Sequence, residues 1–348
     1  MNINRMARKN IRELQPYSSA RNEYSGSSCI LLDANENSFG SVIEGKYHRY
    51  PDPIQKQLKE QIALLKNISA DRIFLGNGSD EAIDLLIRVF CEPGRDKIMI
   101  FPPTYGMYQV CAGVNNIAVI NVNLTKNFQI SLKEVKLSLD SSVKIIFICS
   151  PNNPTGNLLA VEDIRTLLSD RQRIIIVDEA YIDFAEARSL LQLLPEFNNL
   201  VILQTFSKSW GLAGIRLGMA IGDQDVIALM NKIKYPYNIN LLTQEKALQA
   251  LQNYNHQKVL VKEILKQREW LVSALNRIEI VEHIFPSRAN FILVRFKDAR
   301  LVFKHLWENG IVVRDRSQAI HCENCLRITI GKPGENMNLI NLLLKLQR

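Results

Sequence analysis

The chain has 348 residues, more than one hydrophobic core usually serves, so we expect a large domain with a smaller companion. Hydrophobic residues make up 47% and charged residues 22%, which excludes a largely disordered protein. The formal net charge is +8, but Lys and Arg are spread along the chain among acids; no nucleic-acid partner is expected, because such a binder needs clustered cations with interleaved aromatics.

Helical and strand patterns alternate from about residue 55. The segment Gly76-Asn-Gly-Ser-Asp-Glu81 follows the apolar run 73–75 and precedes residues 82–90, whose apolar spacing is helical. The pattern indicates a strand or turn that leads into a helix N-terminus, where free backbone N–H groups accept an anion. A simple helix cap at Ser79 is the alternative, and it leaves both glycines unexplained.

Five further apolar runs rich in β-forming residues predict strands. They lie at 97–101, 143–149, 173–177, 200–204 and 217–221. Amphipathic segments of helix length separate most of them, which predicts a largely parallel sheet flanked by helices.

Three of these runs end in polar or glycine-rich residues. The endings are SPNNPTG at 150–156, DEAY at 178–181 and TFSK at 205–208. Because the carboxyl ends of strands form the ligand crevice of an open α/β sheet, we expect these segments to converge on one site.

The C-terminal part predicts a compact α+β unit. A long helical segment at 244–275 leaves the large domain. After it we expect strands at 291–296, 311–313 and 326–330, and helices at 300–309 and 335–346.

The segment from Thr205 to Gly218 carries the strongest chemical signal. It places two hydroxyls, Lys208, a glycine-rich turn and Arg216 within a dozen residues of an apolar strand. A buried amine there has a lowered pKa and can condense with an aldehyde, and Thr205, Ser207 and Arg216 can surround a phosphate. The alternative is a surface lysine in a loop.

Asp178 ends an apolar strand, where a carboxylate is unfavourable without a positive partner. A protonated pyridinium nitrogen would be such a partner, and keeping it charged makes the ring a better electron sink. A helix cap is the alternative interpretation of Asp178.

The six cysteines indicate a reducing compartment, because only Cys322 and Cys325 are closely spaced. His321 beside this pair suggests zinc, but there is no second close pair, so ordinary thiols are favoured and no metal is expected. No apolar run approaches the roughly 20 residues that cross a bilayer, and none follows the N-terminal positive charges. We therefore expect a cytoplasmic protein with no membrane partner.

Seven motifs in order resemble the fold-type-I pyridoxal-phosphate aminotransferases, and among them the histidinol-phosphate aminotransferase family. Besides the segments at 76–81, 150–156, 178–181 and around Lys208, they are LDANEN at 32–37, RYPDP at 49–53 and LRITIG at 326–331. The resemblance implies an α/β large domain at 46–250 with a mostly parallel seven-stranded sheet, a small α+β domain at 251–348, and an N-terminal arm and segment at 1–45 that packs with the small domain. Ser38 departs from the family, which usually has proline there.

The resemblance also implies how pyridoxal 5'-phosphate is held. Lys208 would form the Schiff base and act as the base, Asp178 would pair with the pyridinium, and Tyr105 would stack on the ring. Tyr181 and Asn153 would contact the ring hydroxyl. The phosphate would lie among the residues Ser79, Asp80, Thr205, Ser207 and Arg216, and Tyr50 would reach it from the partner subunit of a homodimer.

The resemblance further implies transfer of an amino group from L-histidinol phosphate to 2-oxoglutarate, giving imidazole acetol phosphate and glutamate, in histidine biosynthesis. Arg327 matches the arginine that binds an α-carboxylate in related enzymes, and Arg314 matches a second cation for the phosphate. Tyr17 and Asn35 match residues near the substrate. Pairing of Arg314 with Asp315 or a neighbouring acid is its alternative interpretation, and for Tyr17 it is ordinary packing of the arm.

Other functions remain open at this point. Aromatic amino acid aminotransferases and threonine-phosphate decarboxylases have similar sequences. A non-catalytic pyridoxal-phosphate sensor that regulates transcription is a different class; such proteins carry an additional DNA-binding unit, and no extension of that size precedes residue 30.

Overall fold

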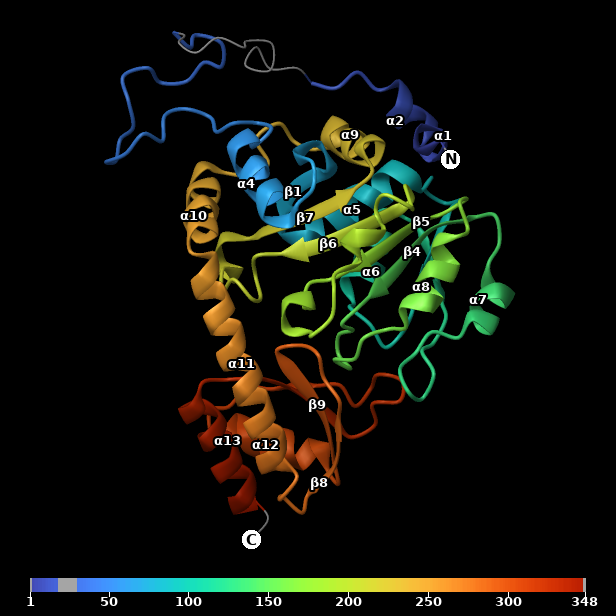
Figure 1. Cartoon of the computed structure of the whole chain (residues 1–348), viewed down its shortest axis with the longest axis vertical. Helices are drawn as coiled ribbons and strands as arrows, with labels where there is room; N and C mark the ends of the chain where they lie inside the picture. The colour runs from blue at the N-terminus through green and yellow to red at the C-terminus, as the bar shows by residue number, and fades with distance from the viewer. Residues whose placement is uncertain (1, 18–29, 347–348) are drawn as a thin grey trace.

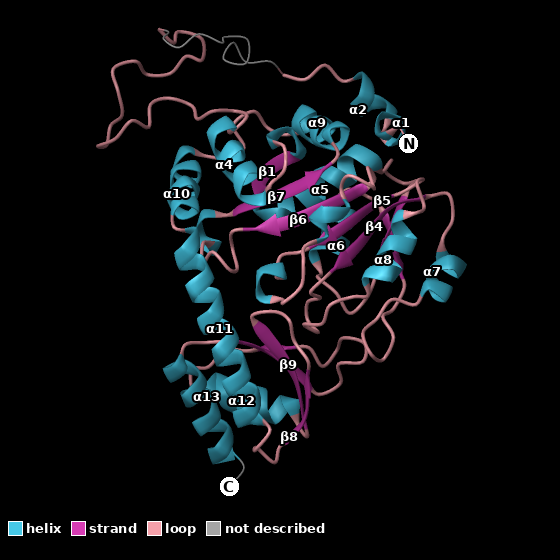
Figure 2. Ribbon diagram, viewed as in Figure 1, coloured by secondary structure: helices cyan, strands magenta, loops and turns pink. Residues whose placement is uncertain are grey.

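The computed structural model describes residues 2–17 and 30–346, and they are organised around two β-sheets (Figures 1 and 2). The larger sheet has seven strands in the order β1-β7-β6-β5-β4-β2-β3. Only β7 runs antiparallel to its neighbours. The strands are β1 (Ile73–Asn77), β2 (Lys97–Ile100), β3 (Ala118–Asn121), β4 (Val143–Cys149), β5 (Ile174–Asp178), β6 (Leu200–Thr205) and β7 (Leu217–Gly222). The predicted α/β class with a mostly parallel sheet is confirmed.

Helices cover both faces of this sheet because its central strands are apolar on both sides (Figure 2). The helices are α4 (Lys56–Lys66), α5 (Gly78–Phe90), α6 (Met107–Val114), α7 (Leu132–Ser138), α8 (Val161–Leu168), α9 (Gln224–Ile233) and α10 (Leu241–Gln252). Helices α4, α7, α8 and α10 contribute to the apolar core on one face, and α5, α6 and α9 to the core on the other. Short 3-10 turns connect some elements: η1 (Ala70–Arg72), η2 (Ile182–Phe184), η3 (Leu190–Leu193) and η4 (Ala213–Ile215).

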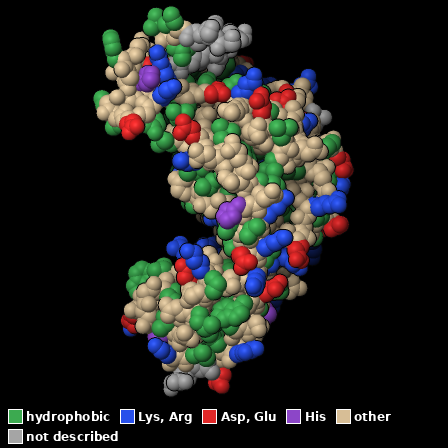
Figure 3. Space-filling view, turned by 60° about the vertical axis from the view of Figure 1, so that its left-hand side comes forward, with side chains coloured by type: hydrophobic (Ala, Val, Ile, Leu, Met, Phe, Trp, Pro, Cys, Tyr) green, Lys and Arg blue, Asp and Glu red, His purple; other side chains and the backbone are tan. Residues whose placement is uncertain are grey.

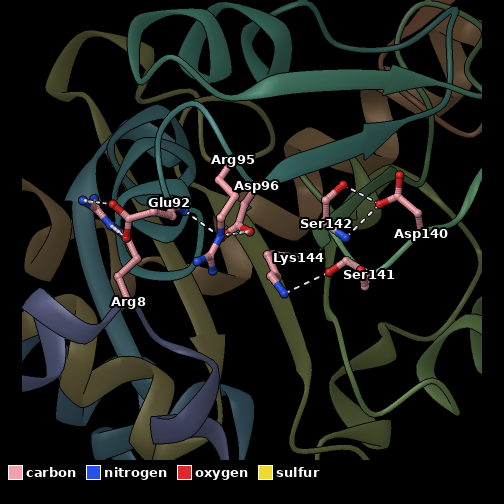
Figure 4. A network of polar contacts seen from close by, with 8 residues as sticks. All are labelled: Arg8, Glu92, Arg95, Asp96, Asp140, Ser141, Ser142 and Lys144. Atoms are coloured by element: carbon pink, nitrogen blue, oxygen red, sulfur yellow. Dashed lines mark hydrogen bonds and ion pairs between the residues drawn. The ribbon is translucent and has the colours of Figure 1, made fainter.

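Two short N-terminal helices, α1 (Ile3–Met6) and α2 (Lys9–Glu13), dock on the second of these cores. Contrary to the expectation, this part of the 1–45 segment therefore does not pack with the small domain. The Arg8 backbone N–H donates to the carbonyl of Val89 at 2.9 Å, and its guanidinium pairs with Glu92 at 3.2 Å. Figure 4 shows this pair beside Asp96, whose carboxylate accepts the Glu92 backbone N–H at 2.8 Å. The start of the chain is thereby tied to the end of α5.

The smaller sheet is antiparallel throughout, in the order β10-β11-β9-β8. Its strands are β8 (Val281–Phe285), β9 (Phe291–Phe296), β10 (Arg314–Asp315) and β11 (Cys325–Thr329). The helices of this unit are α11 (Tyr254–Leu275), α12 (Ala299–Glu308) and α13 (Pro333–Leu346), which share a separate apolar core with one face of the sheet. The predicted α+β unit is confirmed.

Three details differ from the sequence-based expectation. The single helix expected at 244–275 is interrupted at Asn253, which ends α10 and precedes α11. The strand expected at 311–313 is wrong, because the Ile311 N–H caps α12 by donating to the Leu306 carbonyl at 2.9 Å and Gly310 has φ +78°. Strands β3 and β8 were not expected; both are partly exposed.

None of the helices among the described residues is long and apolar enough to cross a membrane.

A close backbone approach fixes where α5 begins. The Gly78 N–H donates to the Arg216 carbonyl at 2.6 Å, and Gly78 has φ +71°. A Cβ on Gly218, in the neighbouring strand β7, would lie 2.2 Å from the Ser79 backbone nitrogen. Only glycine leaves room for β7 beside the first turn of α5.

We therefore expect Gly218→Ala to destabilise the fold by at least about 2 kcal/mol, because two backbones would have to separate. Gly113→Ala is the matched control. A Cβ at Gly113 in α6 meets nothing within 4 Å, and alanine favours a helix by roughly 0.5–1 kcal/mol. Chemical unfolding of the two variants measures the difference. Equal free energies of unfolding would show that the contact with Ser79 does not constrain β7.

Candidate functional site

The carboxyl ends of β1, β4, β5 and β6 open into one cavity, as predicted for a parallel sheet. Figure 3 shows that the surface is hollowed between the upper and lower parts of the molecule. Ten predicted site residues line the cavity: Ser79, Asp80, Tyr105, Asn153, Asp178, Tyr181, Thr205, Ser207, Lys208 and Arg216. Four residues that were not predicted join them: Gly78, Cys149, Ala180 and Ala213.

One corner of the cavity is built to accept an anion. Ser79 and Asp80 lie in the first turn of α5, where backbone N–H groups have no partner within the helix. The Arg216 guanidinium faces this turn and is only loosely paired, at 3.4 Å, with the Asp80 carboxylate. Thr205 and Ser207 add two hydroxyls that lie 3.0 Å apart. Neutral donors and a cation thus converge on one point.

Lys208 follows β6 and is partly buried in the cavity wall. Its Nζ lies 5.6 Å from the centre of the Tyr181 ring. Burial lowers the pKa of Lys208, and the positive charge of Arg327 lowers it further, although Asp178 acts in the opposite direction. A lowered pKa makes the neutral, nucleophilic amine more available. The exposed surface lysine considered above is excluded by this placement.

Asp178, at the end of β5, is almost fully buried, with 3% of its surface exposed. Its Oδ2 accepts the Tyr108 hydroxyl at 2.7 Å, and its Oδ1 accepts the Ala180 backbone N–H at 3.0 Å. Among the described residues no cation forms an ion pair with it. Burial therefore raises the pKa of Asp178 despite both hydrogen bonds. The carboxylate lacks the positive partner that such a site requires.

Tyr108 is the functional residue that the sequence analysis missed. It lies on α6, its side chain is fully buried, and it stacks on Phe147 with ring centres 4.8 Å apart. It also meets the ring of Tyr105 edge to face, at 5.6 Å. Tyr105 and Tyr108 are three residues apart, so their shared side of the chain was a usable signal. Tyr108 connects the cavity wall to Asp178.

Arg327 links the small sheet to the cavity. It lies on β11, and its guanidinium donates a hydrogen bond to Asn153 Oδ1; Asn153 Nδ2 in turn lies 3.4 Å from the Tyr181 hydroxyl. Burial lowers the pKa of Arg327, and the nearby Arg314 contributes in the same direction. Arg327 thus contacts a residue of the cavity.

Arg314 stands directly opposite Arg327 in the β10–β11 pairing. Like charges in such a cross-strand position repel each other. Asp315 does not relieve this repulsion, because its Oδ1 accepts the Ser317 N–H at 2.8 Å and no ion pair joins Asp315 to Arg314 among the described residues. Arg314 is exposed, as its alternative interpretation held, but the pairing with Asp315 or a neighbouring acid is not present among the described residues. Two cations face the same side of the small sheet without an acid between them.

Three predicted site residues lie elsewhere in this chain. Tyr17 lines a different cavity, beside α9 and the segment 232–236. Asn35 and Tyr50 line a third cavity with Tyr237, on which the Tyr50 ring stacks at 4.4 Å. The pocket around Lys208 is thus assembled without these three side chains.

The cysteine pair of the small unit is buried, and burial raises the pKa of both thiols, that of Cys322 to about 12. Each of the five cysteines in the described residues is a free thiol, and Cys29 lies outside those residues. No group of three potential metal ligands occurs within residues 2–17 and 30–346. The pair therefore behaves as packed side chains.

Comparisons with known proteins agree with this geometry. The model of the class I and II aminotransferase family matches residues 20–343. A histidinol-phosphate aminotransferase of Cytophaga hutchinsonii is 50% identical over 341 residues, 98% of each chain. A histidinol-phosphate aminotransferase structure from Clostridium acetobutylicum has a TM-score of 0.79 at 26% identity and covers 86% of this chain and 91% of its own. The Sinorhizobium meliloti enzyme of that name, solved with pyridoxal-5'-phosphate, has a TM-score of 0.78 at 20% identity and 90% coverage of both chains.

The isolated buried carboxylate predicts a conflict between stability and activity. An aspartate whose pKa is raised by folding stabilises the fold most at low pH, and that contribution is lost as the pH rises from the unfolded value of about 3.9 through the folded one. Asp178→Asn should therefore raise the unfolding temperature of the cofactor-free protein at pH 7 by roughly 2–4 °C, while activity falls on the order of a hundredfold. Thermal unfolding from pH 4 to 8 tests this. The prediction is contradicted if the difference in unfolding temperature between the variant and the native protein does not grow as the pH rises.

Proposed function

The chain belongs to the class I and II aminotransferase family, and we infer from this premise that it transfers the amino group of L-histidinol phosphate to 2-oxoglutarate. The products are imidazole acetol phosphate and glutamate, in histidine biosynthesis. The relatives at 45–50% identity are histidinol-phosphate aminotransferases. One observation carries the substrate: Arg314 and Arg327 stand side by side without an acidic partner among the described residues, and Arg327 is close enough to the partly buried amine of Lys208 to lower its pKa. A phosphate monoester brings up to two negative charges to such a pair.

The cavity fits pyridoxal 5'-phosphate. Asp178 is a buried carboxylate in need of a cation, and the N-terminus of α5 with Arg216 forms an anion corner. When bound, this cofactor supplies an aldehyde that carries the amino group and a ring that acts as an electron sink. The donor groups of the corner suit a phosphate, because hydroxyls, backbone N–H groups and a guanidinium meet there.

We assign the residues as follows. Lys208 Nζ would hold the cofactor covalently and, once freed, would take the proton from the substrate α-carbon. Asp178 would keep the ring nitrogen protonated, Tyr105 would stack on the ring, and Asn153 with Tyr181 would contact its hydroxyl. The phosphate-binding set is Ser79, Asp80, Thr205, Ser207 and Arg216. Arg314 and Arg327 bind the substrate phosphate, with Tyr17 and Asn35 closing over the substrate.

The lowered pKa of Lys208 is what lets one side chain serve as both anchor and base. Burial and the charge of Arg327 both disfavour the ammonium form. The neutral amine can attack an aldehyde and can later accept a proton near neutral pH. An anionic substrate group bound to Arg327 would offset the charge of this arginine and so raise the pKa of Lys208. A more basic amine abstracts a proton more readily once the substrate is in place.

We further propose that the enzyme is a homodimer in which Tyr50 of the partner subunit reaches the cofactor phosphate. Figure 1 shows the segment before α4 running out from the body of the subunit. That segment exposes large apolar side chains, including Ile30, Leu32, Phe39 and Val42. Apolar side chains gathered on an extended arm indicate a protein partner, and a second copy would bury them under two-fold symmetry.

The parts of the chain then have distinct tasks. We propose an arm at 1–45, a large cofactor-binding domain at 46–250 and a small domain at 251–348. The separate apolar core of the small unit and the interruption at Asn253 support this division. We also propose that the enzyme works in the cytoplasm, because free thiols persist in a reducing compartment.

Steady-state kinetics with three amines tests the substrate. We expect kcat/KM for histidinol phosphate to exceed that for phenylalanine by at least about tenfold, because charge-assisted hydrogen bonds to a second arginine contribute roughly 1.5–3 kcal/mol. Arg314→Gln should remove most of this difference. Threonine phosphate should release no CO2. Turnover of phenylalanine or threonine phosphate without turnover of histidinol phosphate would overturn the assignment.

Complementation tests the shared site. Lys208→Ala and Tyr50→Ala should each be strongly impaired, because the first lacks the amine and the second lacks a phosphate contact in both sites of the dimer. Mixing them under conditions of subunit exchange should restore up to about a quarter of the native activity, since half of the dimers are hybrids with one intact site. A mixture no more active than the sum of its parts would place Tyr50 in its own subunit's site or outside both.

A further inference from the structure

A third arginine lies on the same face of the small sheet as Arg314 and Arg327. The Arg316 N–H donates to the Cys325 carbonyl at 2.9 Å, which extends the β10–β11 pairing by one residue beyond Asp315. Side chains alternate along paired strands, so Arg316 lies on the face of Arg314 and Arg327. Leu326 lies on the opposite face, in the core of the small unit.

Arg316 is held in place but lacks a partner. Its Nε is buried and has no hydrogen-bond partner, and among the described residues no acid pairs with its guanidinium. Arg295, on β9 at the other side of β11, differs: its guanidinium lies 3.7 Å from the Glu323 carboxylate and donates to the carbonyls of His321 and Glu323. A buried donor without an acceptor is uncommon in folded proteins and indicates a missing ligand or water.

The three guanidiniums act on one another. Burial lowers the pKa of Arg316, and the charges of Arg327 and then Arg314 lower it further. Tyr181, a residue of the Lys208 cavity, is also close enough to act on Arg316. The repulsion among the three cations is relieved only by an anion that all of them can approach. A phosphate monoester has three terminal oxygens to share among them, whereas a carboxylate has two.

We propose that Arg316 is a specificity-determining residue of the substrate-phosphate subsite, favouring a doubly charged phosphate monoester over a carboxylate or an uncharged group. The inference rests on the proposed function, because it names a further residue of the same site. Arg316 acts together with Arg314 and Arg327 and supplies the donor for the third phosphate oxygen. Arg316 lies two residues after Arg314, and this spacing places both side chains on the same face of the strand.

The test compares two amines that differ only in the phosphate, histidinol phosphate and histidinol. Arg316→Gln should lower kcat/KM for histidinol phosphate at least about ten times more than it lowers that for histidinol, as loss of a charged hydrogen bond predicts. Arg316→Lys, which keeps the charge, should recover part of the difference. Arg300→Gln is the matched control, because Arg300 is an exposed arginine on α12, which packs against the opposite face of the sheet.

A pH series separates charge recognition from packing. The second ionisation of a phosphate monoester has a pKa of about 6, so the native enzyme should lose kcat/KM for histidinol phosphate as the pH falls through that value. Arg316→Gln should flatten this loss, because fewer cations select the doubly charged form. An equal effect on both amines, with an unchanged pH profile, would mean that Arg316 only shapes the loop and would overturn the proposal.

Inhibition by inorganic phosphate tests the role of Arg316 separately from the proposed function. It should inhibit the reaction with glutamate, and Arg316→Gln should raise its inhibition constant at least about fivefold. If the native enzyme does not turn over histidinol phosphate, the proposed function fails, while the effect on phosphate inhibition still decides the role of Arg316. If Arg316→Gln changes neither the inhibition constant nor the ratio of kcat/KM for the two amines, the role of Arg316 is refuted while the proposed function stands.

Discussion

Two buried groups of opposite charge type share one cavity, and desolvation disfavours the charged form of each. Asp178 has a raised pKa and Lys208 a lowered one, although each charge would favour the other. Burial therefore outweighs their mutual attraction. The parallel sheet imposes this arrangement, because β5 and β6 are adjacent and end at the same edge. A ligand with a cationic ring nitrogen and an aldehyde satisfies both groups at once, which is why the cofactor assignment follows from the cavity itself.

The small sheet also holds charged groups close together, but here all the charges are positive. The β10–β11 register places arginines opposite and diagonal to each other, an arrangement in which like charges repel. The core beneath Leu326 fixes the register, because a slip of one residue would turn the arginines into the apolar core. The apolar core of the small unit thus stabilises a register in which the arginines stay close together despite their repulsion. On the proposed function, strand alternation in the small sheet determines which substrate is accepted, while the larger sheet positions the residues that carry out the chemistry.

Much of the fold was predictable because strands buried on both faces leave a continuous apolar signal. The bounds of β4 and β9 agree with the prediction residue for residue. Strands β3 and β8 are partly exposed and lack that signal. Ten of the fourteen residues that line the cavity were predicted from motifs at strand ends and from a family resemblance. Tyr108 was not, because its partner Asp178 is 70 residues away and no local pattern joins them.

The residues that one protomer leaves outside the cavity share a physical cause. Tyr17, Asn35 and Tyr50 belong to the N-terminal part of the chain, and residues 30–55 of that part expose several large apolar side chains. Such a segment gains burial only against another surface. The motifs at 32–37 and 49–53 hold each other, because Glu36 accepts hydrogen bonds from the Arg49 guanidinium at 2.7 Å and from the Tyr50 N–H at 2.5 Å. These contacts order the segment without burying its apolar side chains, so the exposed apolar surface is the physical argument for the proposal that a second subunit completes the site.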